Sequence, residues 1–328
     1  MNLETHFKGW AKPGPIPPGL GAPVSEPART GNLAQRARPE PGAPLAIEPH
    51  ETFDAISGHF RLFQLRDGHR FSTDDLLVAW YGTSWCPTAH TALDLGSGIG
   101  TVGMICAWRL PGARFVTIEA QPESVALARK SVRYNGLIER YEIREGDFRQ
   151  VASSGQPCPH EPHADGQLAD KAVCAPAQSV LRDDEKFDLI TGSPPYFPPE
   201  AGVRSEHPQR LACRFELRGT IADYCAAAAN HLAPGGFFAC VFPNEPGQTA
   251  RVEAGAKATK LVIVRKRPVV FREGEPPLVA LFGLMRAEDL PEWIRGQTWE
   301  EPPLIIRKRN GEIHPEYSTV KLAIGFPP

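Results

Sequence analysis

Apolar and polar positions alternate along the chain with two different periods, one typical of strands and one of helices. The segment HFRLFQLRDGHRFS (59–72) alternates on either side of Asp67-Gly68, a dipeptide that favours a hairpin turn. The apolar run DLLVAWYG (75–82) follows directly and predicts a short helix capped from Ser72, Thr73 and Asp74. The first ordered element is therefore expected to be a hairpin that leads into a helix.

Beyond this segment, short runs rich in branched and aromatic residues alternate with helical runs. The predicted strands are TALDL, RFVTIEA, YEIREGD, KFDLITG, GGFFACVFP, KLVIVRKR and PPLVALFGLMR, and the predicted helices cover Thr101–Leu110, Pro122–Asn135, Ile221–Leu232 and Thr249–Ala258. Such alternation requires right-handed crossovers. It predicts an α/β fold with a mostly parallel sheet and helices on both faces.

Two segments lack this periodicity. Residues 1–50 are crowded with Pro and Gly, so they bury too little apolar surface to offset the entropy of ordering, and we expect a disordered tail. Residues 151–180 contain several turn formers and are expected to form a surface insertion. The remainder, 51–328, is predicted to be one domain.

Composition and charge exclude several classes of protein. The 36 Lys and Arg against 38 Asp and Glu give a net charge of −2, so a nucleic acid would have to be held by local basic patches. The first residues lack the apolar core of a signal peptide, and no apolar run approaches the ~20 residues of a membrane span, so a cytoplasmic protein is expected. The seven cysteines form no Cys-x-x-Cys pair, and the spacing of Cys158, His160, His163 and Cys174 fits no regular zinc site, so no metal is expected.

Candidate chemistry begins where the first strand of the alternating region runs into its helix, at Asp94-Leu95-Gly96-Ser97-Gly98-Ile99-Gly100. Glycines there let the backbone turn tightly and approach a ligand. Glu119 ends the next strand, where an acid can bind ribose hydroxyls, and Asp147 follows the third, within reach of an adenine amine. The same glycines also fit a dinucleotide fingerprint, so this loop alone leaves NAD and a methyl donor open, and the acids can equally be helix caps.

A second loop, Gly192-Ser193-Pro194-Pro195-Tyr196-Phe197, follows the apolar strand FDLIT. Consecutive prolines make the loop rigid and expose carbonyl oxygens beside an aromatic ring. We interpret the Ser193 oxygen and the Pro194 carbonyl as acceptors for an exocyclic amine, and Tyr196 and Phe197 as a stacking surface for its ring. Pro-Pro-aromatic also occurs in plain turns, which is the structural alternative.

From about residue 58 onward the chain resembles class I S-adenosylmethionine-dependent methyltransferases of the amino-methylating branch, and most closely the bacterial family that methylates adenine N6 in the anticodon loop of a valine tRNA. The segments that carry this resemblance, in order, are FSTDDLLVAW, DLGSGIG, SPPYF, HPQRLACRFELRGTIADYCAAAANHLAPGGFFACVFP and HPEYSTVKLAIGF. The resemblance implies a Rossmann-like seven-stranded sheet whose last two strands form an antiparallel edge pair. It also implies S-adenosyl-L-methionine as cofactor and tRNA as partner.

The resemblance also implies roles for individual residues. Donor contacts are implied at Thr73, Asp74, Asp94, Gly96, Ser97, Gly98, Gly100, Glu119 and Asp147, and the target base is implied to lie at Ser193, Pro194, Pro195 and Tyr196. The family usually has Asn where this chain has Ser193. Serine also stands at this position in DNA amino-methyltransferases that act on cytosine N4, so the target base is left open.

Basic residues suggest where a nucleic acid would bind. Arg204, Arg210, Arg214 and Arg218 follow the second loop, and two later runs are Arg265-Lys266-Arg267 and Arg307-Lys308-Arg309. We assign substrate binding to Phe197, Arg210 and Arg214, although charge runs are often solvated surfaces. Three alternatives to tRNA methylation remain: DNA amino-methylation, protein glutamine methylation, and RNA binding without catalysis.

Overall fold

The computed structural model describes residues 46–149, 180–198, 207–291 and 294–326, together with a short antiparallel ladder of β1 (His6–Phe7) and β2 (Trp10–Ala11). Most of the predicted tail, almost all of the predicted insertion and Arg204 lie outside the described residues.

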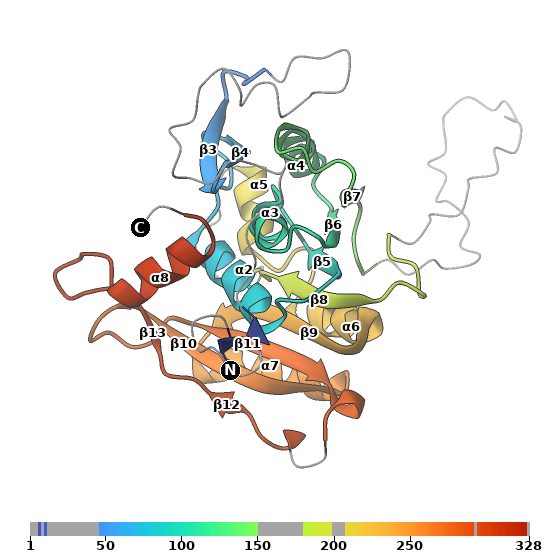
Figure 1. Cartoon of the computed structure of the whole chain (residues 1–328), viewed down its shortest axis with the longest axis vertical. Coiled ribbons are helices and arrows are strands. Elements are labelled where there is room, and N and C mark those ends of the chain that lie inside the picture. The colour runs from blue at the N-terminus through green and yellow to red at the C-terminus, as the bar shows by residue number, and fades with distance from the viewer. Residues whose placement is uncertain are drawn as a thin grey trace, which may run out of the picture.

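A mixed sheet forms the centre of the molecule (Figure 1), with the order β12-β10-β11-β9-β8-β5-β6-β7 and with β13 also paired to β10. Its strands are β5 (Thr91–Leu95), β6 (Arg114–Glu119), β7 (Tyr141–Glu145), β8 (Phe187–Gly192), β9 (Leu232–Pro243), β10 (Leu261–Arg272), β11 (Val279–Arg286), β12 (Trp299–Glu300) and β13 (Leu304–Arg307). The predicted seven strands are all present. β11 runs antiparallel to both β9 and β10, and the other paired strands described in this sheet are parallel.

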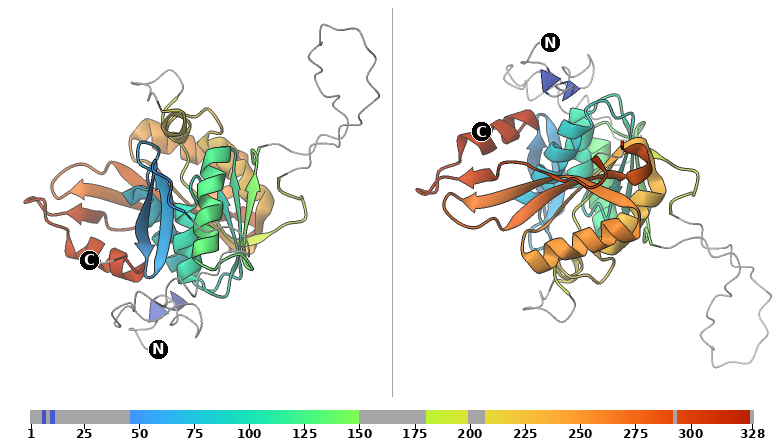
Figure 2. Two further views of the ribbon diagram at one scale, coloured as in Figure 1. Left: turned by 90° about the horizontal axis from the view of Figure 1, so that it is seen from above. Right: turned by 90° about the horizontal axis from the view of Figure 1, so that it is seen from below.

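Helices cover both faces of this sheet, as predicted (Figures 1 and 2). They are α2 (Thr73–Trp85), α3 (Thr101–Arg109), α4 (Pro122–Tyr134), α5 (Pro208–Arg214), α6 (Ile221–His231), α7 (Pro246–Ala258) and α8 (Pro315–Ala323), with a 3-10 turn η1 (Ala287–Asp289). Leu77, Met104 and Leu127 belong to the core on one face, whereas Tyr224 and Val252 belong to the core on the other. This double winding brings the carboxyl ends of β5, β6 and β8 to one edge, where ligands bind in such sheets.

Two predicted details are wrong. The hairpin consists of β3 (Glu51–Ser57) and β4 (Phe60–Leu65), so its turn lies at Gly58, whose φ of +50° suits glycine, and not at Asp67-Gly68. The segment after β4 instead continues toward α2, and the amide of His69 donates to Gln209 Oε1 at 2.8 Å. The hairpin packs along α4 (Figure 2).

The second error concerns the edge of the sheet. β10 and β11 are antiparallel, as expected, but they are not its edge, because β12 and β13 both pair in parallel with β10 on its outer side. The sequence EPPLIIRKR is a weak strand signal, because its apolar run is only Leu304-Ile305-Ile306 and two prolines precede it.

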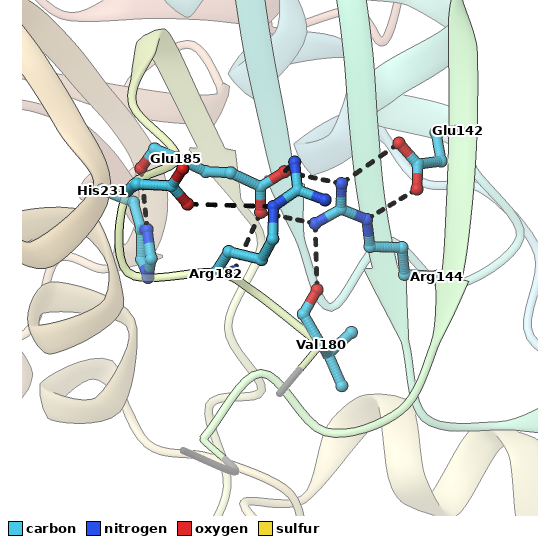
Figure 3. A network of polar contacts seen from close by, with 7 residues as sticks. Glu142, Arg144, Val180, Arg182, Glu185 and His231 are labelled. Carbon is cyan, nitrogen blue, oxygen red and sulfur yellow. Dashed lines mark hydrogen bonds and ion pairs between the residues drawn. The ribbon is translucent and has the colours of Figure 1, made fainter. Parts of the chain in front are cut away.

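An ion-pair network fixes β7 to the segment that leads into β8 (Figure 3). The Arg144 guanidinium binds both carboxylate oxygens of Glu185, at 2.6 and 2.7 Å, and also donates to Glu142 and to the Val180 carbonyl. The hydrogen bonds from Arg144 lower the pKa of Glu185 from its ordinary value of 4.5 to about 2. The described residues on either side of the predicted insertion are thereby held together at the sheet.

Candidate active site

One cleft of about 360 Å³ opens at the carboxyl ends of β5, β6 and β8, and both predicted loops line it. All the predicted site residues line this cleft except Thr73, Gly100 and Arg210. Gly100 is the residue before α3, and Arg210 lies in α5 with a side chain outside the described part of the structure. The fold thus brings together residues that are more than 120 positions apart, such as Asp74 and Tyr196.

The glycine loop has a backbone that only glycine adopts without strain. Gly96, Gly98 and Gly100 have φ values of +62°, +55° and +89°. A Cβ at Gly96 would lie 2.3 Å from the Tyr224 hydroxyl, whereas a Cβ at Gly98 would meet nothing within 4 Å. Gly96 is therefore required by its packing against Tyr224, whereas Gly98 lines the cleft beside open space.

Glu119 ends β6 and joins the glycine loop. Its two carboxylate oxygens accept hydrogen bonds from the amides of Gly98, at 2.8 Å, and Gln121, at 2.7 Å. The side chain is only 6% exposed, and this burial raises its pKa despite the two amides. Each oxygen keeps a lone pair that can accept from a hydroxyl in the cleft.

Asp94 is a buried residue of β5 that links α3 and β8 beside the cleft. It is 2% exposed, and its oxygens accept from the Gly103 amide at 3.1 Å and the Thr191 hydroxyl at 2.8 Å. The carboxylate thus lies at the N-terminus of α3 and joins β5 to β8. Burial raises its pKa to about 7. With both oxygens engaged, the geometry fits Asp94 as a positioning residue.

Asp147 lies on the other wall of the cleft, after β7. Arg149 binds its carboxylate through the backbone amide and the guanidinium, with N–O distances of 2.9 Å from the amide and from Nε. These bonds lower the pKa of Asp147. The carboxylate is therefore ionised at neutral pH and available as an acceptor.

The second loop crosses the cleft and contacts α2. The Tyr196 hydroxyl donates to Asp74 Oδ2 at 3.0 Å and also hydrogen-bonds the Ser193 side chain. Its ring packs edge-on against Phe242, with centroids 5.6 Å apart. Tyr196 is consequently fixed at both ends of its side chain. Ser72 is the N-cap of α2, as predicted, and Asp75 completes a capping box by accepting from the Ser72 amide at 2.9 Å.

Two adjacent acids of α2, Asp74 and Asp75, line the cleft. Burial, followed by the charge of the adjacent Asp75, raises the pKa of Asp74 to about 6, and burial raises that of Asp75 to about 6 as well. Carboxylates this close to one another in a buried wall favour a cationic occupant.

The mouth of the cleft is aromatic and basic. Phe197 is 41% exposed, and the Arg214 guanidinium lies 5.7 Å from the centre of its ring. Backbone hydrogen bonds join the loop to the end of α5, from the Phe197 amide to the Arg214 carbonyl and from the Glu216 amide to the Phe197 carbonyl. Arg214 and Phe197 are therefore joined through their backbones at the rim.

Sequence reasoning missed several residues of this cleft. Tyr224 on α6 lies under both loops, because a Cβ at Gly192 would also come within 2.7 Å of its ring. In the sequence Arg218 is only part of a basic run. In the structure it lines the cleft, where its positive charge favours the ionised forms of Glu119 and Asp147. Cys213 lies beside Gln121, which donates to its sulfur at 3.6 Å. No local motif marks these residues, because the tertiary fold alone brings them to the site.

Known proteins resemble this chain in sequence and in fold. The family described as methyltransferase small domain matches residues 75–156. The chain is 25% identical over 263 residues to the tRNA1(Val) (adenine(37)-N6)-methyltransferase of Histophilus somni strain 129Pt, covering 80% of this chain and 92% of that protein. It is also 25% identical to the protein of the same name from Pasteurella multocida, covering 79% of this chain and 92% of the relative.

Among solved structures, a predicted O-methyltransferase from Agrobacterium tumefaciens superposes with a TM-score of 0.51 at 18% identity, covering 78% of this chain and 98% of the other. This likeness concerns the fold, which is that of class I methyltransferases. Together, these findings support an S-adenosylmethionine-dependent methyltransferase. The family and the fold imply S-adenosylmethionine as its methyl donor.

Two arginines of the basic run Arg265-Lys266-Arg267, a weaker candidate for RNA binding in the sequence, form ion pairs within the fold. The Arg265 guanidinium lies between Trp85 and Trp299, 3.2 and 3.9 Å from the ring centres, and pairs with Glu301 at 3.0 Å. Arg267 pairs with Glu316. These cations are neutralised within the fold, so they offer no charge to a phosphate.

Across the described ranges, no group of three or more His, Cys, Asp or Glu side chains is arranged to hold a metal ion. No helix in that same part of the chain is long and apolar enough to cross a membrane.

Proposed function

We propose that this methyltransferase transfers a methyl group from S-adenosylmethionine to the N6 amine of an adenine in tRNA. The observation that carries the proposal is the hydrogen bond from Tyr196 to Asp74, because it joins the second loop to α2 inside the cleft that the glycine loop also lines. The names of the relatives support adenine in tRNA as the target. Such a substrate would place the protein in the cytoplasm.

The donor half of the cleft fits S-adenosylmethionine. Ser97 Oγ is buried in this wall and has no hydrogen-bond partner among the described residues, and a buried polar group of this kind calls for a ligand or a water. Glu119 would accept from the ribose hydroxyls, and Asp147 from the adenine amine. The space at Gly98, where a Cβ would meet nothing within 4 Å, would admit the nucleoside, and the Asp74 carboxylate in the cleft wall would favour the positively charged part of the donor.

The second loop would orient the acceptor amine. When bound, the donor supplies a methyl group on a positively charged sulfur. An exocyclic amine is a poor nucleophile because its lone pair is delocalised into the ring. Ser193 Oγ and the Pro194 carbonyl would accept hydrogen bonds from its two N–H groups and favour a tetrahedral nitrogen, and Pro195 keeps this loop rigid. Tyr196 would position the ring of the base by stacking.

The rim would hold the RNA around the target base. Phe197 offers an exposed ring, and Arg214 offers a guanidinium that stacks on it. Arg210 is assigned the same role from the sequence. A loop base that leaves its stack can enter the cleft past this rim.

The test is transfer of labelled methyl from S-adenosylmethionine to unmodified tRNA, ribosomal RNA, DNA and a glutamine-containing peptide, offered separately and followed by digestion. Label recovered as N6-methyladenosine from tRNA is the expected result. Label in cytosine N4 of DNA or in glutamine would assign the same chemistry to another amine. Intact donor binding with no transfer to any pool would overturn the proposal and leave a binding protein with this fold.

A further inference from the structure

A second basic run lies at the same edge of the sheet as the cleft. β13 runs parallel to β10, with Arg307 opposite Arg272 at the ends of both strands. Because β10 is parallel to the strands that form the cleft, Arg307 lies at their carboxyl edge. The chain then returns through α8, which packs beside β13 (Figure 1).

Arg307 and Lys321 are cations on two elements that pack against one another, Arg307 at the end of β13 and Lys321 on α8. Arg307 is exposed and donates to the Gly311 carbonyl at 2.9 Å, while Lys321 lies on α8 with its ammonium 5.7 Å from the centre of the Phe326 ring. Burial and then the charge of Arg307 lower the pKa of Lys321, so the two positive groups act on one another.

No carboxylate in the described part of the chain forms an ion pair with either cation. The nearest acids in sequence are already engaged, since Glu312 pairs with Lys308 at 3.0 Å and Glu316 pairs with Arg267. This separates the pair from Arg265 and Arg267, whose charges are neutralised by Glu301 and Glu316. Two neighbouring cations without an acid are an arrangement suited to an anion.

Tyr317 connects this pair to the cleft. It lies one helical turn before Lys321, is 7% exposed, and hydrogen-bonds the side chain of Thr73. The charges of Arg307 and Asp74 both act on its hydroxyl. Thr73 is the first residue of α2, and the next residue, Asp74, lines the cleft and binds Tyr196. α8 also packs against α2, so the elements that carry both cations adjoin the wall of the cleft at Asp74.

We propose that Arg307 and Lys321 together bind a backbone phosphate of the substrate RNA next to the target nucleotide. This inference rests on the proposed function, because it takes RNA as the substrate. It gives Thr73 a structural role as the contact between α2 and Tyr317. The phosphate contact fixes the position of the RNA and carries no base specificity.

The experiment measures binding of unmodified tRNA to the full chain at several salt concentrations, beside the KM for tRNA and the donor affinity. The variants are Arg307→Gln, Lys321→Gln and the double substitution, and the matched control is Lys308→Gln, whose cation is already paired with Glu312. We expect the double variant to bind tRNA roughly tenfold more weakly near 0.1 M salt, with a salt slope reduced by about 1. Donor affinity and kcat at saturating tRNA should not change, and the control should stay within about twofold of wild type.

The two proposals fail in different ways. If wild type methylates tRNA but the double variant keeps its KM and its salt slope, the phosphate site is wrong and the proposed function stands. If wild type binds tRNA with the predicted dependence on Arg307 and Lys321 but transfers no methyl group, the reaction is wrong and the phosphate site stands. Absence of any tRNA binding by wild type overturns both.

Discussion

The two halves of the cleft are built in different ways. In the donor half, Asp94 and Glu119 are almost completely buried, and backbone amides or a neighbouring hydroxyl occupy their oxygens. In the target half, Phe197 and Arg214 are exposed, and they are joined to the fold through hydrogen bonds between backbone atoms. The first half is part of the core, whereas the second is a surface attached to it.

This difference indicates which substitutions should cost stability and which should cost only function. Changes in the donor half disturb main-chain geometry shared with β5 and β8, so stability and donor binding should fall together. Changes in the target half remove side-chain surface and should alter substrate use alone. Tyr196 lies between the two cases, because it belongs to the second loop but is hydrogen-bonded to Asp74.

The largest effect is expected from Gly96→Ala. The new Cβ would lie 2.3 Å from the Tyr224 hydroxyl at a φ of +62°, so both a clash and backbone strain arise. We expect a loss of about 2–5 kcal/mol in the free energy of unfolding, together with loss of measurable donor binding. Denaturant unfolding and calorimetric titration with S-adenosylmethionine measure the two quantities.

Gly98→Ala is the matched control for this substitution. Its φ is similarly positive, but its Cβ would meet nothing within 4 Å. It should cost only the strain of about 1–2 kcal/mol while still weakening donor binding by filling the space above the loop. Equal losses of stability in the two variants would show that Tyr224 does not restrict Gly96.

The contrast between the halves also explains what the sequence could predict. The glycine loop, Glu119 and the strand ends follow local rules, because a strand that turns into a helix through positive φ angles requires glycine. The hairpin turn was misplaced because Asp67-Gly68 is a strong local signal, whereas the actual turn at Gly58 depends on pairing with β3. The packing of Tyr224 under the glycine loop and the ion pair of Arg265 both depend on contacts between segments far apart in the sequence, so residue spacing does not predict them.

Tyr196→Ala tests the boundary between the two halves. Stacking on an aromatic ring contributes about 1–3 kcal/mol per base, so kcat/KM for RNA should fall about 5- to 150-fold while donor affinity stays within a few-fold of wild type. Tyr196→Phe keeps the ring and removes only the hydrogen bonds of the hydroxyl, to Asp74 and to the Ser193 side chain, so it should lose less activity. Methylation unchanged in Tyr196→Ala would rule out the stacking role.

The pH dependence of the free energy of unfolding tests the burial of the Asp74 carboxylate. The pKa of Asp74 is about 6 in the folded chain against an ordinary value of 3.8, so the native state holds this proton more tightly than the unfolded state. Ionised Asp74 therefore costs stability, and the cost develops as pH rises from about 4 to about 6. Asp74→Asn should be more stable than wild type at pH 8, by at most about 3 kcal/mol, and equal to it near pH 4.

Asp147→Asn provides the opposite sign for comparison. Arg149 lowers the pKa of Asp147, so ionised Asp147 stabilises the native state, and this contribution is lost as pH falls below its ordinary value of 3.8. The Asn variant should accordingly be the less stable protein at neutral pH, with a difference that shrinks in acid. Thermal unfolding of both variants across this range measures the two trends, and a pH-independent difference for Asp74→Asn would contradict the burial argument.

The smallest effect is expected at the rim, from Phe197→Ala. Its ring is 41% exposed and contacts Phe215 and Arg214, so its loss should change the free energy of unfolding by no more than about 1 kcal/mol. KM for the RNA should rise by about two- to fivefold, with donor affinity unchanged. Leu217→Ala is the control, because Leu217 is equally exposed, at 45%, but does not line the cleft. If both variants changed KM alike, the effect would belong to the whole segment after α5 and not to an aromatic contact with the substrate.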